Sequence, residues 1–130
     1  MTEQRKIPFV GTVDTNPETK PFWDGCVAGK LVIPQCVETK KYVWYPRAIS
    51  PHTLGPVEWR EVSGKGTVYT YSVMRGNPPY VIGYVELAEG VKMMTNIVNC
   101  DPNSVKIGMA VKVVFLPTEG GPPMPFFEPA

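Results

Sequence analysis

Histidine and cysteine are scarce in this chain of 130 residues, which has one histidine and three cysteines. Cys26, Cys36 and Cys100 do not make a paired disulfide framework, so we expect reduced thiols and a cytoplasmic location. A proton-shuttling site would depend entirely on His52, because no second imidazole is present. We therefore expect no catalytic residues in this chain and no enzyme activity of its own.

An excess of charge and a long apolar run are also missing. The 13 basic and 12 acidic residues give a formal net charge of +1, so no strong field attracts nucleic acid or anionic lipid. No apolar run approaches the length that crosses a bilayer, and residues 1–6 are polar and lead into no apolar secretory segment. We expect a protein without a membrane partner.

Proline and glycine, in contrast, are abundant, with 15 and 12 copies, so loops and extended arms should take up much of the chain. The sequence pattern divides the chain into three stretches. Residues 1–30 are expected to form an arm and a helix, residues 31–62 a segment resembling a zinc ribbon, and residues 63–130 a barrel with an extended tail.

A short amphipathic helix is predicted near the end of the first stretch. Phe22, Trp23, Cys26 and Val27 fall on one face at helical spacing, and Gly29 suits the exit. The polar, weakly patterned residues before Pro17 are typical of an extended arm.

The second stretch predicts a small hairpin. Residues 31–36 and 42–46 are rich in β-branched and aromatic side chains, and a polar turn separates them. Residues 57–62 alternate between apolar and polar side chains, which predicts a further strand.

The third stretch contains four strand-like segments separated by turns with glycine or capping residues. They cover residues 67–74, 80–87, 91–99 and 111–116. Short strands of this kind suit a small closed barrel better than a sandwich.

The tail over residues 117–130 contains five prolines and is expected to be extended. Phe126 and Phe127 leave two alternatives open for it. The two rings could anchor the tail on a partner protein, or they could fold back on the barrel as a last strand.

Cys36, Thr39, Ser50 and Thr53 occupy the positions at which a zinc ribbon carries its two knuckles. A structural zinc site needs four ligands, mostly thiolates. Only Cys36 is a thiol, and a nitrogen from His52 would not complete the set. We therefore predict no metal ligands and no bound zinc. Without zinc, hydrogen bonds from the three hydroxyls, a partner chain or the packing of apolar side chains would hold the segment, the apolar side chains being Tyr42, Trp44, Tyr45 and Leu54.

Together, the order of these features resembles the DUF35 family from about Pro17 onward. The segments that carry the resemblance are Pro21-Phe22-Trp23, residues 31–36, Tyr45-Pro46-Arg47, residues 59–71, residues 79–87 and residues 107–115. Family members join an N-terminal helix and a rubredoxin-like zinc ribbon to an acyl-CoA-associated OB-fold. The resemblance thus implies a mainly β fold with an N-terminal helix, a ribbon-like hairpin and a C-terminal OB-fold barrel.

The resemblance also implies an accessory role. Family members typically associate with thiolase-like enzymes, which are acyltransferases or carbon–carbon lyases on acyl-CoA substrates. We therefore expect a noncatalytic acyl-CoA-binding or scaffold subunit, with a coenzyme A thioester as ligand and no tightly bound cofactor. The oligomeric state, including a homo-oligomer, is left open.

A coenzyme A site needs cations for the phosphates and an apolar lane for the pantetheine and acyl chain. The candidate phosphate contacts are Lys65, Arg75 and Lys92. The candidates for the apolar lane are Phe22, Trp23, Met74 and Tyr80. The polar loop over residues 75–79 is the most suggestive segment, because it joins two strands of the predicted barrel.

A stand-alone single-stranded nucleic-acid binder is the alternative function, because OB-folds commonly bind such strands. A stacking surface with phosphate contacts could combine Tyr69, Tyr71, Tyr80 and Tyr84 with Arg60, Lys65, Arg75 and Lys92. The net charge near zero disfavours this alternative, because phosphate neutralisation supplies most nonspecific affinity. The tyrosines could equally fill the barrel or face a partner.

Overall fold

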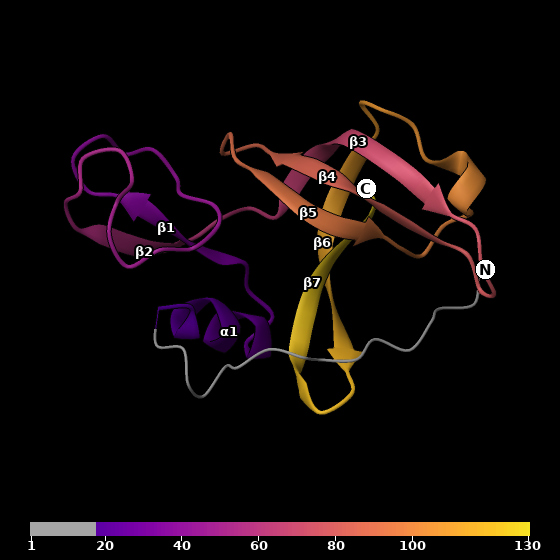
Figure 1. Cartoon of the computed structure of the whole chain (residues 1–130), viewed down its shortest axis with the longest axis horizontal. Coiled ribbons are helices and arrows are strands. Elements are labelled where there is room, and N and C mark those ends of the chain that lie inside the picture. Colours follow the sequence, from indigo (N-terminus) through magenta and orange to yellow (C-terminus); the bar gives the residue numbers. More distant parts are fainter. Residues whose placement is uncertain (1–17) are drawn as a thin grey trace.

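The computed structural model describes residues 18–130, and the predicted N-terminal arm lies outside these residues. The described part is mainly β, with one short helix, a two-stranded hairpin and a closed barrel (Figure 1). The elements in chain order are α1 (Lys20–Val27), β1 (Val32–Cys36), β2 (Val57–Glu61), β3 (Lys65–Met74), β4 (Tyr80–Leu87), β5 (Lys92–Ile97), the 3-10 turn η2 (Pro102–Ser104), β6 (Ala110–Thr118) and β7 (Gly121–Pro129).

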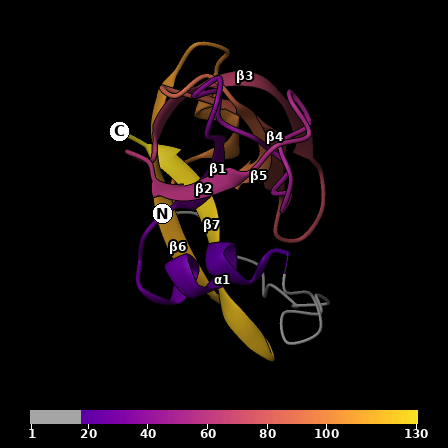
Figure 2. The same ribbon diagram turned by 90° about the vertical axis from the view of Figure 1, so that its left-hand side faces the viewer.

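Helix α1 begins after Thr19 and ends where Gly29 adopts a φ of 75°. Phe22 and Cys26 are buried as predicted, whereas Val27 is exposed, because the eight-residue helix has only a narrow buried face. Gly25 is required inside the helix: a Cβ there would lie 2.8 Å from the carbonyl oxygen of Lys30. Figures 1 and 2 show α1 beside β7, below the barrel.

The hairpin pairs β1 with β2, from Val32 opposite Glu61 to Cys36 opposite Val57. The predicted partner of β1, residues 42–46, makes only one isolated bridge, between Tyr42 and Gln35. The Cys36 amide also donates to the Lys41 carbonyl, and the Val43 amide donates to the Pro34 carbonyl, so residues 41–43 lie along one edge of β1. This pairing ends at Val43, whereas β2 pairs with β1 along its whole length.

The barrel closes in the order β3-β4-β5-β7-β6, which is the arrangement of an OB-like fold. All neighbouring strands are antiparallel except β5 and β7, which meet at the single parallel pair Ile97 and Phe127. The predicted fold class, with its N-terminal helix, hairpin and OB-fold barrel, is confirmed.

The proline-rich tail forms β7, the strand that closes the barrel. Phe126 and Phe127 are buried, and Phe127 is 0% exposed. Of the two alternatives for these rings, the structure has the one in which they fold back on the barrel. Proline has no backbone N–H to donate, so it is tolerated where a strand edge makes few hydrogen bonds. Strand β7 pairs along its length with β6 but meets β5 at one register pair, so its edge toward β5 needs few amide donors.

One hydrophobic core runs through all three stretches of the chain. It joins Phe22 of α1 and Ile33 of β1 to barrel residues such as Val68, Val85 and Phe127. Within the ribbon-like segment, Tyr42 and Trp44 pack against this core. Tyr45 is 61% exposed, but its ring packs edge-on against Trp44 with the ring centres 5.6 Å apart. The prediction that Leu54 also holds the segment is wrong, because this side chain is 82% exposed.

Candidate functional site: a cleft between strand β3 and turn η2

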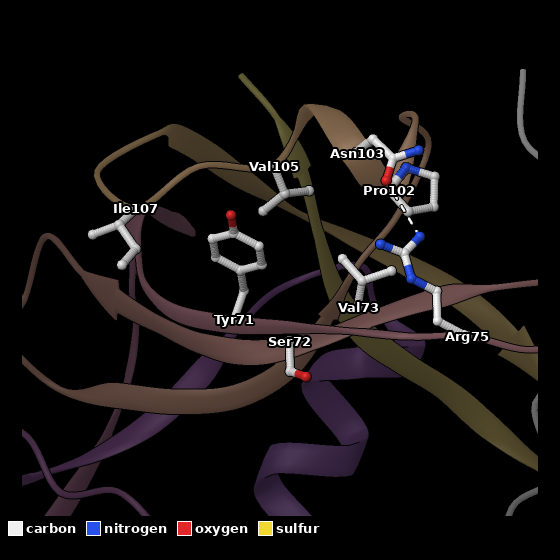
Figure 3. Close-up of a pocket in the computed structure, with 8 residues that line it drawn as sticks. All are labelled: Tyr71, Ser72, Val73, Arg75, Pro102, Asn103, Val105 and Ile107. Carbon is white, nitrogen blue, oxygen red and sulfur yellow. Dashed lines mark hydrogen bonds between the residues drawn. The ribbon is translucent and has the colours of Figure 1, made fainter.

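A cleft with a volume of about 560 Å³ lies between the end of β3 and the segment that joins β5 to β6 (Figure 3). Its lining residues are Tyr71, Ser72, Val73, Arg75, Pro102, Asn103, Val105 and Ile107. Pockets that bind small molecules usually measure roughly 300–1,000 Å³ and combine apolar walls with a few polar groups. The cleft therefore has the size and the composition of a ligand site.

Alternation along β3 decides which side chains face the cleft. Figure 3 shows the side chains of Tyr71 and Val73 pointing toward Val105, while Ser72 points to the other side of the strand. Val105 is buried and Ile107 is largely exposed, so the cleft is closed at its base and open at one end. The apolar wall is thus formed by Tyr71 and Val73, which are two residues apart on β3, and by the segment with Val105 and Ile107, which is distant in sequence.

The polar end of the cleft is held by the cap of η2. The Asp101 carboxylate accepts a hydrogen bond of 2.9 Å from the backbone N–H of Asn103. The Ser104 hydroxyl donates to the backbone carbonyl of Asp101 at 2.6 Å. These bonds fix Asn103, whose side-chain oxygen accepts from Arg75 Nη1 at 3.3 Å (Figure 3). The loop after β3 is thereby joined to η2 by one side-chain hydrogen bond.

Arg75 makes no ion pair with any acidic side chain of residues 18–130. Five other cations of these residues lie within ion-pair distance of a carboxylate, as Arg60 does to Glu58 at 2.7 Å, whereas Lys40, Lys41, Arg47, Lys65 and Lys106 resemble Arg75 in having no such pair. A guanidinium presents its donors in a fork that matches phosphate or carboxylate oxygens. The charge of Arg75 is therefore available to an anionic group at the mouth of the cleft.

The structure separates the predicted acyl-CoA residues into three groups. Met74 pairs with Tyr80 across β3 and β4, next to Arg75. Lys65 and Lys92 lie at the opposite end of these strands, roughly 30 Å away for a ten-residue strand.

The remaining two predicted residues, Phe22 and Trp23, line a small apolar cavity beside α1. Only Arg75 of the predicted set lines the cleft, and the contact of each predicted residue with acyl-CoA stays a prediction.

The cleft residues that the sequence did not single out come mainly from the segment between β5 and β6. Asn103, Val105 and Ile107 follow the Asp101 cap, which the sequence does signal as a helical turn. No local pattern shows that this turn faces the end of β3, because barrel closure alone brings the two together.

The tyrosines of the nucleic-acid alternative do not fill the barrel. Tyr69, Tyr71 and Tyr84 are between 39% and 49% exposed. Lys92 lies 4.8 Å from the Tyr69 ring centre and 3.8 Å from the Glu86 carboxylate, so its charge is partly neutralised. Tyr69 and Tyr84 therefore present aromatic surface to solvent, whereas Tyr71 lines the cleft, and there is little free positive charge around Tyr69.

The four knuckle positions meet around one sulfur atom. The hydroxyls of Ser50, Thr39 and Thr53 hydrogen-bond to the Cys36 thiol and lower its pKa from 9.0 to about 6. The distance from Cys36 Sγ to Thr53 Oγ1 is 3.6 Å, and Cys36 and Ser50 are each 0% exposed.

One thiol and three hydroxyls do not fit a structural zinc site. Residues 18–130 contain no cluster of three or more histidine, cysteine, aspartate or glutamate side chains that could hold a metal ion. Within the same residues, no helix has the length and apolar character needed to span a membrane. That zinc is not bound stays a prediction.

The closed five-stranded barrel with a cleft on its wall defines an OB-fold protein. Residues 59–116 match the family model of the ChsH2 C-terminal OB-fold domain. A DUF35 domain-containing scaffold protein of Methanothermobacter thermautotrophicus is 36% identical over 62% of this chain and 68% of the relative. The chain belongs to the DUF35 family.

Two further comparisons extend this result. The probable enoyl-CoA hydratase alpha subunit of Thermomonospora curvata is 35% identical over 99% of this chain, which spans 43% of that relative. The solved structure described as an Ltp2-ChsH2(DUF35) aldolase matches with a TM-score of 0.78 and 30% identity, over 88% of this chain and 95% of that chain. A DUF35 structure from Sulfolobus solfataricus, 15% identical with a TM-score of 0.66, shares the fold.

Proposed function

We propose that this protein is a noncatalytic, cytoplasmic subunit that binds acyl-CoA and supports a thiolase-like partner enzyme. Its relatives include proteins named as scaffolds and as hydratase alpha subunits, and a similar chain occurs in a structure described as an Ltp2-ChsH2 aldolase. Each of these names describes a scaffold protein, a subunit of an enzyme or a component of an enzyme complex. This supports a role as a partner subunit, with the catalytic groups on the other protein.

The observation that carries the acyl-CoA part of the proposal is the cleft beside β3. A coenzyme A thioester carries phosphates at one end and a flexible, largely apolar arm at the other. The unneutralised Arg75 guanidinium suits a phosphate, and the wall of Tyr71, Val73 and Val105 suits the arm. Met74 and its register partner Tyr80 lie beside Arg75 but, by the alternation along β3, on the opposite face of the strand from Tyr71 and Val73, so neither lines the cleft.

Isothermal titration with coenzyme A and acetyl-CoA tests the site. The Arg75→Gln variant should bind at least roughly tenfold more weakly, since a hydrogen bond to a charged group contributes about 1.5–3 kcal/mol. Arg60→Gln is the matched control, because Arg60 is exposed and already paired with Glu58, and it should bind as the wild type does. Equal affinities of the Arg75→Gln variant and the wild type would place the ligand elsewhere.

Co-purification tests the partner. The tagged protein, produced together with a thiolase-like enzyme from its own genome, should elute with that enzyme in gel filtration. If the native protein elutes alone and no acyl-CoA gives a binding signal, the accessory role is rejected.

The exposed tyrosines support single-stranded nucleic acid as the second candidate ligand. Tyr69 and Tyr84 present their rings on the outside of the barrel, where bases could stack. A mobility shift with oligonucleotides at low salt that weakens steeply as salt rises would support this alternative. No shift at low salt would remove it.

A further inference from the structure

A second cavity lies where the helix, the ribbon-like segment and the barrel meet. Its volume is about 150 Å³, and its walls come from α1, residues 44–46, β5 and β7. None of its lining residues belongs to the cleft beside β3. Helix α1 and turn η2 lie on opposite sides of the barrel (Figures 1 and 2), so a ligand in one site does not occupy the other.

Aromatic rings and thioethers form the walls of this junction cavity. The Phe22 ring centre lies 4.9 Å from that of Trp23 and 5.2 Å from that of Trp44, in edge-on and tilted arrangements. Met93 of β5 and Met124 of β7 also line the cavity. Packed aromatic rings hold a fixed shape, whereas methionine side chains adapt to what they contact. The lining therefore favours an uncharged, apolar occupant.

The volume limits the size of that occupant. An enclosed apolar cavity of about 150 Å³ accepts a molecule such as benzene, so this volume suits a single ring. A long acyl chain or a fused four-ring system exceeds this space. Tyr45 and Met94 contribute to the lining and are each 61% exposed, so the cavity has a rim that reaches solvent.

We propose that the junction cavity is a binding site for one compact apolar group, the size of a single six-membered ring. The ligand class is a neutral aromatic or cyclic hydrocarbon moiety, either free or at the end of a larger molecule whose remainder lies outside the rim. This site is separate from the cleft beside β3 and does not depend on the function proposed for that cleft. An occupant contacts α1, the ribbon-like segment and the barrel at once, so binding stabilises their packing.

Toluene is the probe, and the methionine methyl groups of the wild-type protein report where it binds. In a protein labelled at the methionine methyls, added toluene should shift the Met93 and Met124 signals by ring currents. Met74 and Met109 line neither the cavity nor its rim, and their signals should stay in place. Unmoved signals of Met93 and Met124 at toluene saturation would overturn the proposal, as would larger shifts at Met74 or Met109.

A filled cavity provides the second test. Met124→Phe should reduce toluene affinity at least tenfold and remove the rise in melting temperature that toluene causes in the wild type. Circular dichroism verifies that the variant is folded. Arg75→Gln, in the separate cleft, should leave toluene binding unchanged, and Met124→Phe should leave coenzyme A binding unchanged. A folded Met124→Phe protein that binds toluene as the wild type does would contradict the proposal.

Discussion

Hydroxyl groups surround Cys36 at the positions where a zinc ribbon carries thiolates. Ser50, Thr39 and Thr53 each hydrogen-bond to its sulfur, so the two knuckles are joined through one thiol and its hydroxyl neighbours. These bonds stabilise the thiolate, which explains a pKa of about 6 for a side chain that is 0% exposed. Local polar contacts therefore replace the metal as the link between the knuckles.

The first prediction concerns pH. The pKa of the Cys36 thiol is about 6 in the folded protein, against an ordinary value of 9.0. Between these two pH values, the thiol is protonated in the unfolded chain and deprotonated in the folded chain. The free energy of unfolding should therefore rise with pH across this window, and this contribution is fully present above pH 9.0 and lost as the pH falls through about 6. Urea unfolding at several pH values measures it.

Cys36→Ser should flatten this rise, whereas Cys100→Ser should retain it, because Cys100 has a raised pKa from burial. Burial also raises the pKa of Cys26 to about 12, so this thiol lowers the free energy of unfolding as the pH rises above 9.0. The measurements should therefore stay below pH 9.0. The same slope in the wild type and in Cys36→Ser would contradict the prediction.

The second prediction concerns metal. Replacing Thr39, Ser50 and Thr53 by cysteine together should create a four-thiolate site that binds one zinc per chain, because all three side chains already contact Cys36. The wild type should contain far less than one zinc per chain. Metal analysis after dialysis measures both, and stoichiometric zinc in the wild type would refute the predicted absence.

At the scale of elements, close backbone approach decides how β3 and β4 pair. Gly83 lies opposite Tyr71, and a Cβ at Gly83 would lie 2.4 Å from the Thr70 carbonyl oxygen and 3.0 Å from the Tyr71 Cα. Neither contact can be relieved by rotating a side chain. The irregular register between Val68 and Thr70 bends β3 at this point, as barrel closure requires.

The third prediction follows from this contact. Gly83→Ala should lower the free energy of unfolding by about 1–3 kcal/mol, because the added methyl group forces the backbones of β3 and β4 apart. Gly76→Ala is the control, since its nearest contact would be 3.8 Å from the new Cβ, and it should change stability by less than about 0.5 kcal/mol. Urea denaturation compares the two, and equal stabilities would show that β3 and β4 tolerate the added methyl.

At the scale of the whole molecule, the continuous core makes the helix, the ribbon-like segment and the barrel depend on one another. Phe22 on α1 belongs to the same buried cluster as Val85 and Phe127 in the barrel. The ribbon-like segment also joins this cluster through Ile33 and Val62. We therefore expect one cooperative unfolding transition for the described part of the chain.

The fourth prediction tests this coupling. Tryptophan fluorescence reports mainly on α1 and the ribbon-like segment through Trp23, Trp44 and Trp59, whereas circular dichroism reports mainly on the barrel. The two transitions should coincide in urea. Phe22→Ala should shift both together by about 3–5 kcal/mol, because it leaves a cavity in the shared core. Two separate midpoints would show that the barrel unfolds independently.

The sequence by itself determined the local elements. Alternating side chains and glycine turns predicted the barrel strands β3 to β6, helical spacing predicted α1, and knuckle spacing placed Cys36 with its three hydroxyl neighbours. These features depend on residues close together in the chain, so a local pattern suffices to predict them.

Tertiary structure alone decided the long-range pairings. It paired β1 with β2, closed the barrel with the proline-rich β7, brought Asn103 to Arg75 and separated Phe22 from Lys65 and Lys92. Each of these results depends on which distant segments share a core and on the register in which their strands meet. No local pattern of side chains encodes that choice, because several partners would satisfy the same alternation.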